Sequence, residues 1–124
     1  MTAVADHLDL TQLGVLLRQR YDETAAQLRT ETEAEAAWLR HIHDQGPGDS
    51  ADAGNAVSET AEHGLVTAAL QEQLNRLGDA LTRLGEGTLG TCDRCGEPVP
   101  PGRLEVMPWA THCVPCQSRV DRRR

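Results

Sequence analysis

All four cysteines of the sequence lie in two CxxC pairs near its C-terminal end, Cys92 with Cys95 and Cys113 with Cys116. The complete pattern is C-x2-C-x17-C-x2-C. Each pair can bring two thiolates to one ion, and two pairs supply the tetrahedral set of four sulfur ligands that zinc prefers. The spacing therefore predicts one structural zinc ion. A catalytic zinc is not expected, because four thiolates leave no open coordination position.

Other uses of the same residues are weaker. Iron in a rubredoxin-like site is the main rival, but Trp109 is the only aromatic residue near the cysteines. Two disulfides are less expected, because paired cysteines in a reducing compartment more often hold a metal. His112 could replace a cysteine as ligand, yet with four thiols present it is expected to be exposed or to lie beside the site.

Residues 87–124 form the predicted zinc-finger domain, which is expected to end in a helix. So short a segment cannot bury a self-sufficient core, so metal binding would supply much of its folding free energy.

Two long helices are predicted before the finger. Apolar residues recur at steps of three and four over residues 8–44, which indicates one amphipathic helix. A second helix is expected to run to about Leu84, and its leucines keep a heptad spacing, at Leu70, Leu74, Leu77, Leu81 and Leu84. The fold class predicted is therefore mainly α, with residues 1–86 as a long antiparallel helical hairpin, a coiled coil, before the finger.

A polar loop is expected to join the two helices, with the tip of the hairpin near residues 45–55. Gly46, Pro47 and Gly48 stop a helix. Asp49, Ser50 and Asp52 are candidate N-caps of the second helix, and Ser58 is a later candidate start. If the two aspartates only cap the helix, they contact no partner.

The charge of the chain is uneven. Residues 1–87 hold 15 acidic residues and 6 arginines, a formal charge of −9, whereas residues 88–124 hold 4 acidic residues and 6 arginines, a charge of +2. The first segment would repel nucleic acid. The start of the sequence lacks the features of a signal peptide, and no apolar run is long enough to cross a membrane. A cytoplasmic protein is therefore expected.

The finger segment GTLGTCDRCGEPVPPGRLEVMPWATHCVPCQ resembles that of the DksA/TraR family of zinc-finger transcription factors. The shared positions are Gly90, Cys92, Cys95, Gly96, Val99, Arg103, Leu104, Pro108, Cys113 and Cys116. The hairpin extends the resemblance over most of the chain. At the tip, DSADAG matches the family's DxxDxA motif at Asp49 and Asp52, while Gly54 stands where the family has alanine.

This resemblance implies a regulator that binds bacterial RNA polymerase without contacting DNA. The hairpin would enter the secondary channel, and Asp49 and Asp52 would modulate the stability of promoter complexes near the active centre. Arg103, Arg119 and Arg122 are candidate docking residues at the channel rim. A link to guanosine tetraphosphate is a further possibility that the family raises. A monomer is expected.

Other function classes fit the sequence less well. The runner-up is a zinc-ribbon adaptor or dimerisation protein that uses the leucine seam from Leu70 to Leu84 to bind another chain. Direct DNA binding through the arginine-rich end RVDRRR is the weakest alternative, because the chain is acidic and lacks base-reading motifs. An enzyme is not expected, since the sequence shows no nucleophile with a base, no phosphate-binding loop and no open metal site.

Overall fold

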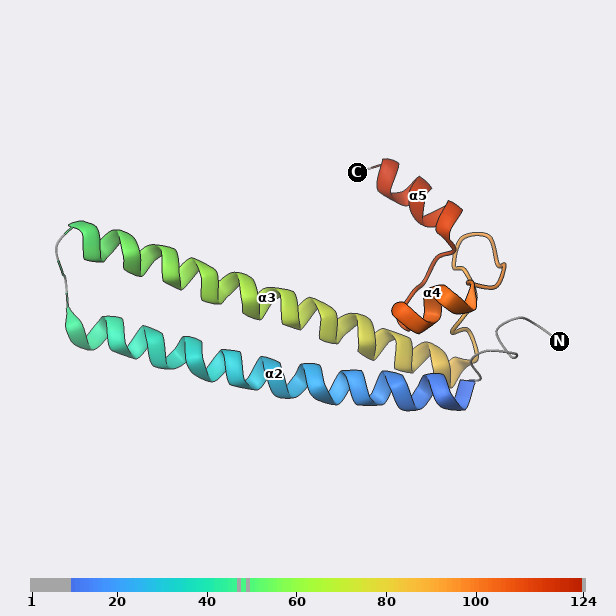
Figure 1. Ribbon diagram of the computed structural model, residues 1–124, viewed down its shortest axis with the longest axis horizontal. Coiled ribbons are helices and arrows are strands. Elements are labelled where there is room, and N and C mark those ends of the chain that lie inside the picture. Colours follow the sequence, from blue (N-terminus) through green and yellow to red (C-terminus); the bar gives the residue numbers. More distant parts are fainter. Residues whose placement is uncertain (1–9, 47, 49, 124) are drawn as a thin grey trace. The chain divides into compact units, whose positions relative to one another are not determined.

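The protein is mainly helical, as predicted. The structure, a computed structural model, describes residues 10–46, 48 and 50–123. The helices in this part of the chain are α2 (Leu10–Gln45), α3 (Ser50–Glu86), α4 (Pro101–Val106) and α5 (Val114–Arg122) (Figure 1). Within the same residues, β pairing is limited to one antiparallel bridge between Thr91 and Pro98.

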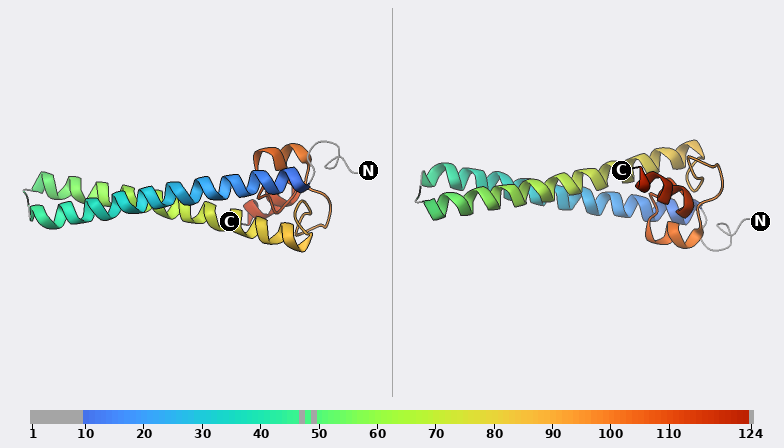
Figure 2. Two further views of the ribbon diagram at one scale, coloured as in Figure 1. Left: turned by 90° about the horizontal axis from the view of Figure 1, so that it is seen from below. Right: turned by 90° about the horizontal axis from the view of Figure 1, so that it is seen from above.

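Helices α2 and α3 form the predicted hairpin, and Figure 2 shows them side by side from two further directions. The connection between them is shorter than expected. Helix α2 ends at Gln45, before Gly46 with its positive φ of 70°, and α3 begins as early as Ser50. Most of the segment expected to be loop is therefore the first turns of α3. The small residues in these first turns of α3 lack the apolar period by which a helix is recognised in a sequence.

The chain divides into two compact units. One comprises the described residues as far as Tyr21 together with those from Arg76 onward, and the other comprises Asp22–Asn75. Within the first unit, finger residues Leu89 and Trp109 pack against side chains from the start of α2 and the end of α3. The division into residues 1–86 and 87–124 stays a prediction. Among the described residues, none of the helices has the length and apolar character that crossing a bilayer requires.

The first unit contains a core where the ends of the two long helices meet the finger. Its buried members are Leu13, Leu17, Leu77, Ala80 and Leu89, and Tyr21, Leu81, Leu84 and Trp109 pack against them. The helices approach closely here, because a Cβ added at Gly14 would lie 2.9 Å from Cδ2 of Leu84. Three leucines of the seam thus pack within one chain.

A second core holds the finger together. It contains the buried side chains of Cys92, Val99, Leu104, Ala110 and Cys116, with Met107 and Cys113 beside them. Helix α4, which the sequence pattern did not predict, supplies Leu104 to this cluster. Pro101 suits the first position of that helix, since a proline there loses no intrahelical hydrogen bond.

Candidate metal centre

Four cysteine sulfurs converge at one point in the finger. The Sγ atoms of Cys92, Cys95, Cys113 and Cys116 all lie within 4.8 Å of one another. The sulfurs of Cys95 and Cys113 are 3.8 Å apart. Sulfurs placed 2.3 Å from a zinc ion at tetrahedral angles would be separated by about 3.8 Å. The donor set therefore fits one tetrahedral ion.

No disulfide joins these cysteines, since all four are free thiols. The distance of 3.8 Å between the sulfurs of Cys95 and Cys113 is far longer than the bond of about 2.05 Å in a disulfide. The arrangement therefore supports metal binding over the disulfide alternative.

The first pair lies on a tight knuckle of the backbone. The N–H of Cys92 donates to the carbonyl of Glu97 at 2.8 Å, and the N–H of Gly96 donates to the carbonyl of Cys92 at 3.0 Å. Gly96 has a φ of 75°, a conformation in which a side chain would be strained. The glycine after the first CxxC thus lets the chain turn back and present both sulfurs to one side.

The second pair begins helix α5. Cys113 occupies the N-cap position, Pro115 follows in the first turn, and Cys116 is buried there. The N–H of Gln117 closes this turn on the carbonyl of Cys113 at 2.9 Å. The first turn of α5 therefore spaces the two sulfurs so that both can reach one ion.

The crowded sulfurs influence one another's protonation. A hydrogen bond with the side chain of Cys113, and burial after it, raise the pKa of Cys116 to about 12. Burial opposes ionisation of Cys92, yet hydrogen bonds from backbone N–H groups, first that of Cys95 and then that of Cys113, lower its pKa to about 5. Metal binding requires all four thiolates, so zinc must displace the protons that the cluster retains.

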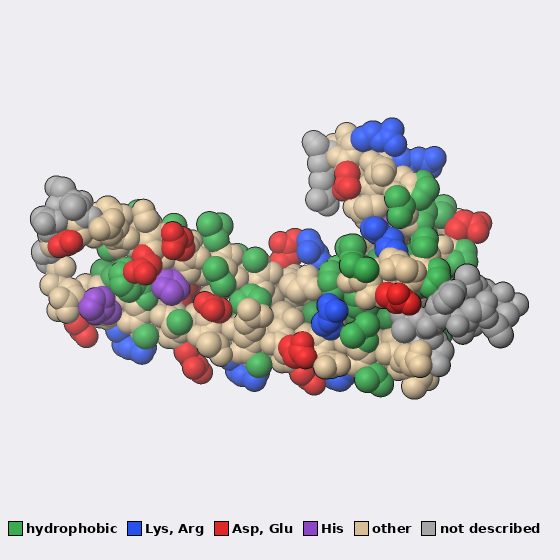
Figure 3. Space-filling view, in the orientation of Figure 1, with side chains coloured by type: hydrophobic (Ala, Val, Ile, Leu, Met, Phe, Trp, Pro, Cys, Tyr) green, Lys and Arg blue, Asp and Glu red, His purple; other side chains and the backbone are tan. Residues whose placement is uncertain are grey.

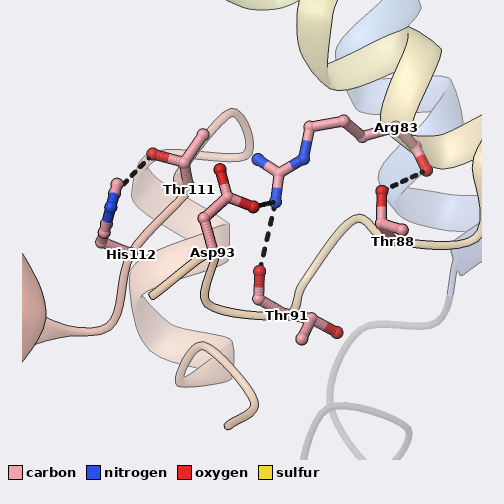
Figure 4. A network of polar contacts seen from close by, with 6 residues as sticks. All are labelled: Arg83, Thr88, Thr91, Asp93, Thr111 and His112. Carbon is pink, nitrogen blue, oxygen red and sulfur yellow. Dashed lines mark hydrogen bonds and ion pairs between the residues drawn. The ribbon is translucent and has the colours of Figure 1, made fainter. Parts of the chain in front are cut away.

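His112 is not part of the sulfur cluster. Its Nδ1 lies 2.8 Å from the hydroxyl of Thr111 (Figure 4). Among the described residues, the group able to hold a metal consists of the four cysteines alone. The expectation that His112 lies beside the site agrees with this position.

Arg103 contributes to the support of the second pair. Its Nε donates to the carbonyl of His112 at 3.0 Å, directly before Cys113. The side chain is half-buried. By contrast, Arg119 and Arg122 are exposed in the last turns of α5. The docking role of all three arginines stays a prediction.

The predicted tip residues are only partly described. Asp49 lies outside the described residues, whereas Asp52 is exposed in the first turn of α3. A Cβ added at Gly54, where the family has alanine, would meet nothing within 4 Å. An alanine would therefore fit at this position, and the glycine is not required by packing.

A contact that sequence reasoning missed joins the two helices within Asp22–Asn75. The indole N–H of Trp38 donates to the hydroxyl of Thr60 at 2.9 Å. That hydroxyl donates in turn to the carbonyl of Ala56 at 2.8 Å. The Trp38 ring also lies beside those of His41 and His63, with centroid separations of 5.7 Å and 6.2 Å.

Comparison with known proteins agrees with this metal centre. The family model described as "Prokaryotic dksA/traR C4-type zinc finger" matches residues 87–122. The cofactor of the four cysteines is therefore zinc. The family's pattern favours it over the iron alternative that spacing alone left open.

The resemblance to whole proteins extends beyond the finger. The chain is 31% identical over 101 residues to the "RNA polymerase-binding transcription factor DksA" of Caulobacter vibrioides, which aligns 82% of this chain with 63% of that protein. It is 32% identical over 71 residues to "General stress protein 16O" of Bacillus subtilis, covering 57% of this chain and 44% of the relative. The chain spans between 34% and 63% of the length of the first curated relatives it matches.

A solved structure shares the fold as well as the sequence. The structure of the transcription factor DksA2 from Pseudomonas aeruginosa superposes with a TM-score of 0.78 at 25% identity. The match covers 92% of this chain and 84% of that one, so it includes hairpin and finger together. With its four-cysteine finger following a helical hairpin, the chain belongs to the DksA/TraR family of C4-type zinc-finger proteins.

Proposed function

We propose that this chain is a transcription regulator that binds bacterial RNA polymerase, inserts its hairpin into the secondary channel and modulates promoter-complex stability through Asp49 and Asp52. The observation that carries the proposal is the alignment with a protein named as an RNA polymerase-binding transcription factor, which covers 82% of this chain. The alignment is too long to rest on the zinc finger alone, so it favours a shared use of the hairpin.

The charge of the hairpin supports this partner. Residues 22–75 contain eleven acidic residues and two arginines, a formal charge of −9. Acidic side chains are spread over the visible face of α2 and α3 in Figure 3. A long acidic element suits a positively lined pore, because complementary potentials steer association and fix orientation.

The finger would dock at the rim of the channel. Arg119 and Arg122 are exposed on α5 and can meet an acidic surface of the polymerase. Arg103 is partly committed to the carbonyl of His112, so its share in docking is expected to be smaller. No contact of these arginines with DNA is proposed.

The adaptor alternative loses support from the packing of the leucine seam. Leu77 is fully buried in the chain's own core, and Leu81 and Leu84 pack against it. These side chains are therefore engaged within one chain rather than offered to another. A monomer acting in the cytoplasm, where the polymerase is found, fits the proposal best. The link to guanosine tetraphosphate stays a prediction that nucleotide binding to the assembled complex can test.

A pull-down of the zinc-loaded chain with core RNA polymerase tests the proposed partner. Binding is expected, and it should weaken as salt rises, because exposed charges are screened over about 8 Å at physiological ionic strength. Duplex DNA serves as the competing ligand. Binding to duplex DNA as tight as to the polymerase, or polymerase binding that does not respond to salt, would argue against this mode.

A further inference from the structure

Arg83 reaches from the end of α3 to the first cysteine pair. Its side chain is only 14% exposed. The guanidinium Nη2 donates to Oδ1 of Asp93 at 2.8 Å and to the carbonyl of Thr91 at 3.2 Å (Figure 4). Both acceptors belong to the knuckle around Cys92, so one side chain holds this segment from the helix.

The same segment connects the two cysteine pairs. Asp93 lies between Cys92 and Cys95, and its N–H donates to the carbonyl of Thr111 at 2.8 Å. Thr111 is two residues before Cys113. Arg83 therefore contacts the residue whose backbone links the first cysteine pair to the segment before the second.

The backbone of Arg83 also fixes the route of the chain into the finger. Its carbonyl accepts hydrogen bonds from the N–H groups of Thr88, at 2.9 Å, and Leu89, at 3.3 Å. The Thr88 hydroxyl donates to the same carbonyl at 3.4 Å. Main chain and side chain of Arg83 thus together hold the segment from Thr88 to Asp93, which leads into the knuckle.

We propose that Arg83 is a positioning residue for the metal centre, which holds the first cysteine pair in place so that zinc is retained although the arginine contacts no sulfur. Groups that orient metal ligands commonly change metal affinity by 10–100-fold when they are removed. Arg83 contacts the two residues next to the ligand Cys92 rather than the ligand itself. An effect near the lower end of that range is therefore expected. Linkage makes the effect reciprocal: zinc stabilises the end of α3 through the same contact.

A purely stabilising role explains the arginine less well. In the described residues, its Nη1 is buried and has no hydrogen-bond partner. An unsatisfied buried donor costs free energy, and an apolar side chain of similar length would remove that cost. Methionine at this position should therefore leave the packing of α3 nearly unchanged while it releases the knuckle.

The test measures zinc release from the full chain to a chromophoric chelator. Arg83→Met is expected to release zinc about tenfold faster than the parent, following the magnitude above. Asp93→Asn should also accelerate release, because it weakens the same ion pair. The double variant should release zinc no faster than Arg83→Met, since Arg83→Met already removes the contact with Asp93 that Asp93→Asn weakens.

Arg94→Met is the matched control. Arg94 lies beside Asp93 in the same CxxC, is exposed, and carries the same charge near the sulfurs. Its replacement should leave the release rate within about twofold of the parent if position rather than charge retains the metal. If Arg94→Met and Arg83→Met accelerated zinc release equally, the proposal would be overturned. Zinc release at the parental rate in both Arg83→Met and Asp93→Asn would overturn it as well.

Hydrogen exchange of residues 80–86 supplies a second readout. Zinc should slow exchange in the parent and have a smaller effect in Asp93→Asn, a variant that keeps Arg83 and its helix intact. An equal response to zinc in both proteins would contradict the coupling even if Arg83→Met failed to fold.

Discussion

At the scale of single residues, the sulfur cluster explains why a short segment folds. Four thiolates within 4.8 Å of one another repel, and a divalent cation removes that repulsion while it closes the finger. The buried side chains around it are few, namely Val99, Leu104 and Ala110 beside Cys92 and Cys116. Metal binding is therefore expected to supply most of the folding free energy of this segment.

Replacing Cys113 with serine tests this dependence. The variant is expected to lose its zinc, because three thiolates and a hydroxyl bind the ion far more weakly. The finger should unfold, while most of the helical circular-dichroism signal of α2 and α3 remains. Some helix should fray near Leu77, because finger residues Leu89 and Trp109 complete that core. Metal analysis of the reduced parent should give one zinc per chain; iron, or less than half an equivalent of any metal, would contradict the account.

The residues of the metal centre could be predicted from sequence because ligand type and spacing carry the chemistry directly. The residues that support the centre could not. Arg83 meets Asp93 across ten positions, and Arg103 meets the carbonyl of His112 across nine. Neither separation follows a helical or strand period, so only the folded backbone brings these groups together.

At the scale of elements, the apolar period predicted both long helices but not all of their ends. The start of α3 stayed open between several candidates, because residues 50–56 are small or polar and carry no apolar stripe that would decide between a start near Ser50 and one at Ser58. Helix α4 was missed because its six residues are too few to show a period. The heptad spacing identified the leucine seam of α3 but left open whether its partner is the same chain or another one. In the structure Leu77 packs with Leu13 and Leu17 of α2, so the partner lies in the same chain.

The bond between Trp38 and Thr60 gives the second unit a contact whose value can be measured. Trp38→Phe keeps an aromatic ring but removes the indole N–H, while the Thr60 hydroxyl still donates to Ala56. The free energy of unfolding is expected to fall by about 1 kcal/mol, a typical net value for one hydrogen bond. Chemical denaturation followed by circular dichroism measures it. Leu39→Phe, which adds an aromatic ring at an exposed position of the same helix, should change stability much less; equal losses in the two variants would assign the effect to general helix perturbation.

At the scale of the whole molecule, the acidic residues and the zinc ligands occupy different parts of the sequence. The stretch from residue 22 to residue 75 carries a formal charge of −9, whereas the arginines at the end of the sequence follow the zinc ligands. Binding free energy that is distributed along the hairpin and finger would leave the tip free to act on the polymerase by charge. Tip residues should therefore matter more for regulation than for affinity.

The lifetime of promoter complexes in the presence of an Asp49→Asn, Asp52→Asn double variant tests the central claim most directly. Asparagine keeps the size and most of the helix-capping ability of aspartate while removing two charges. A Glu31→Gln, Glu33→Gln variant makes the same change in charge on the stem and serves as control. The tip variant should bind core RNA polymerase within a few-fold of the parent yet lose most of its effect on lifetime, whereas the control keeps that effect. A tip variant that regulates as well as the parent would contradict the role of these two aspartates.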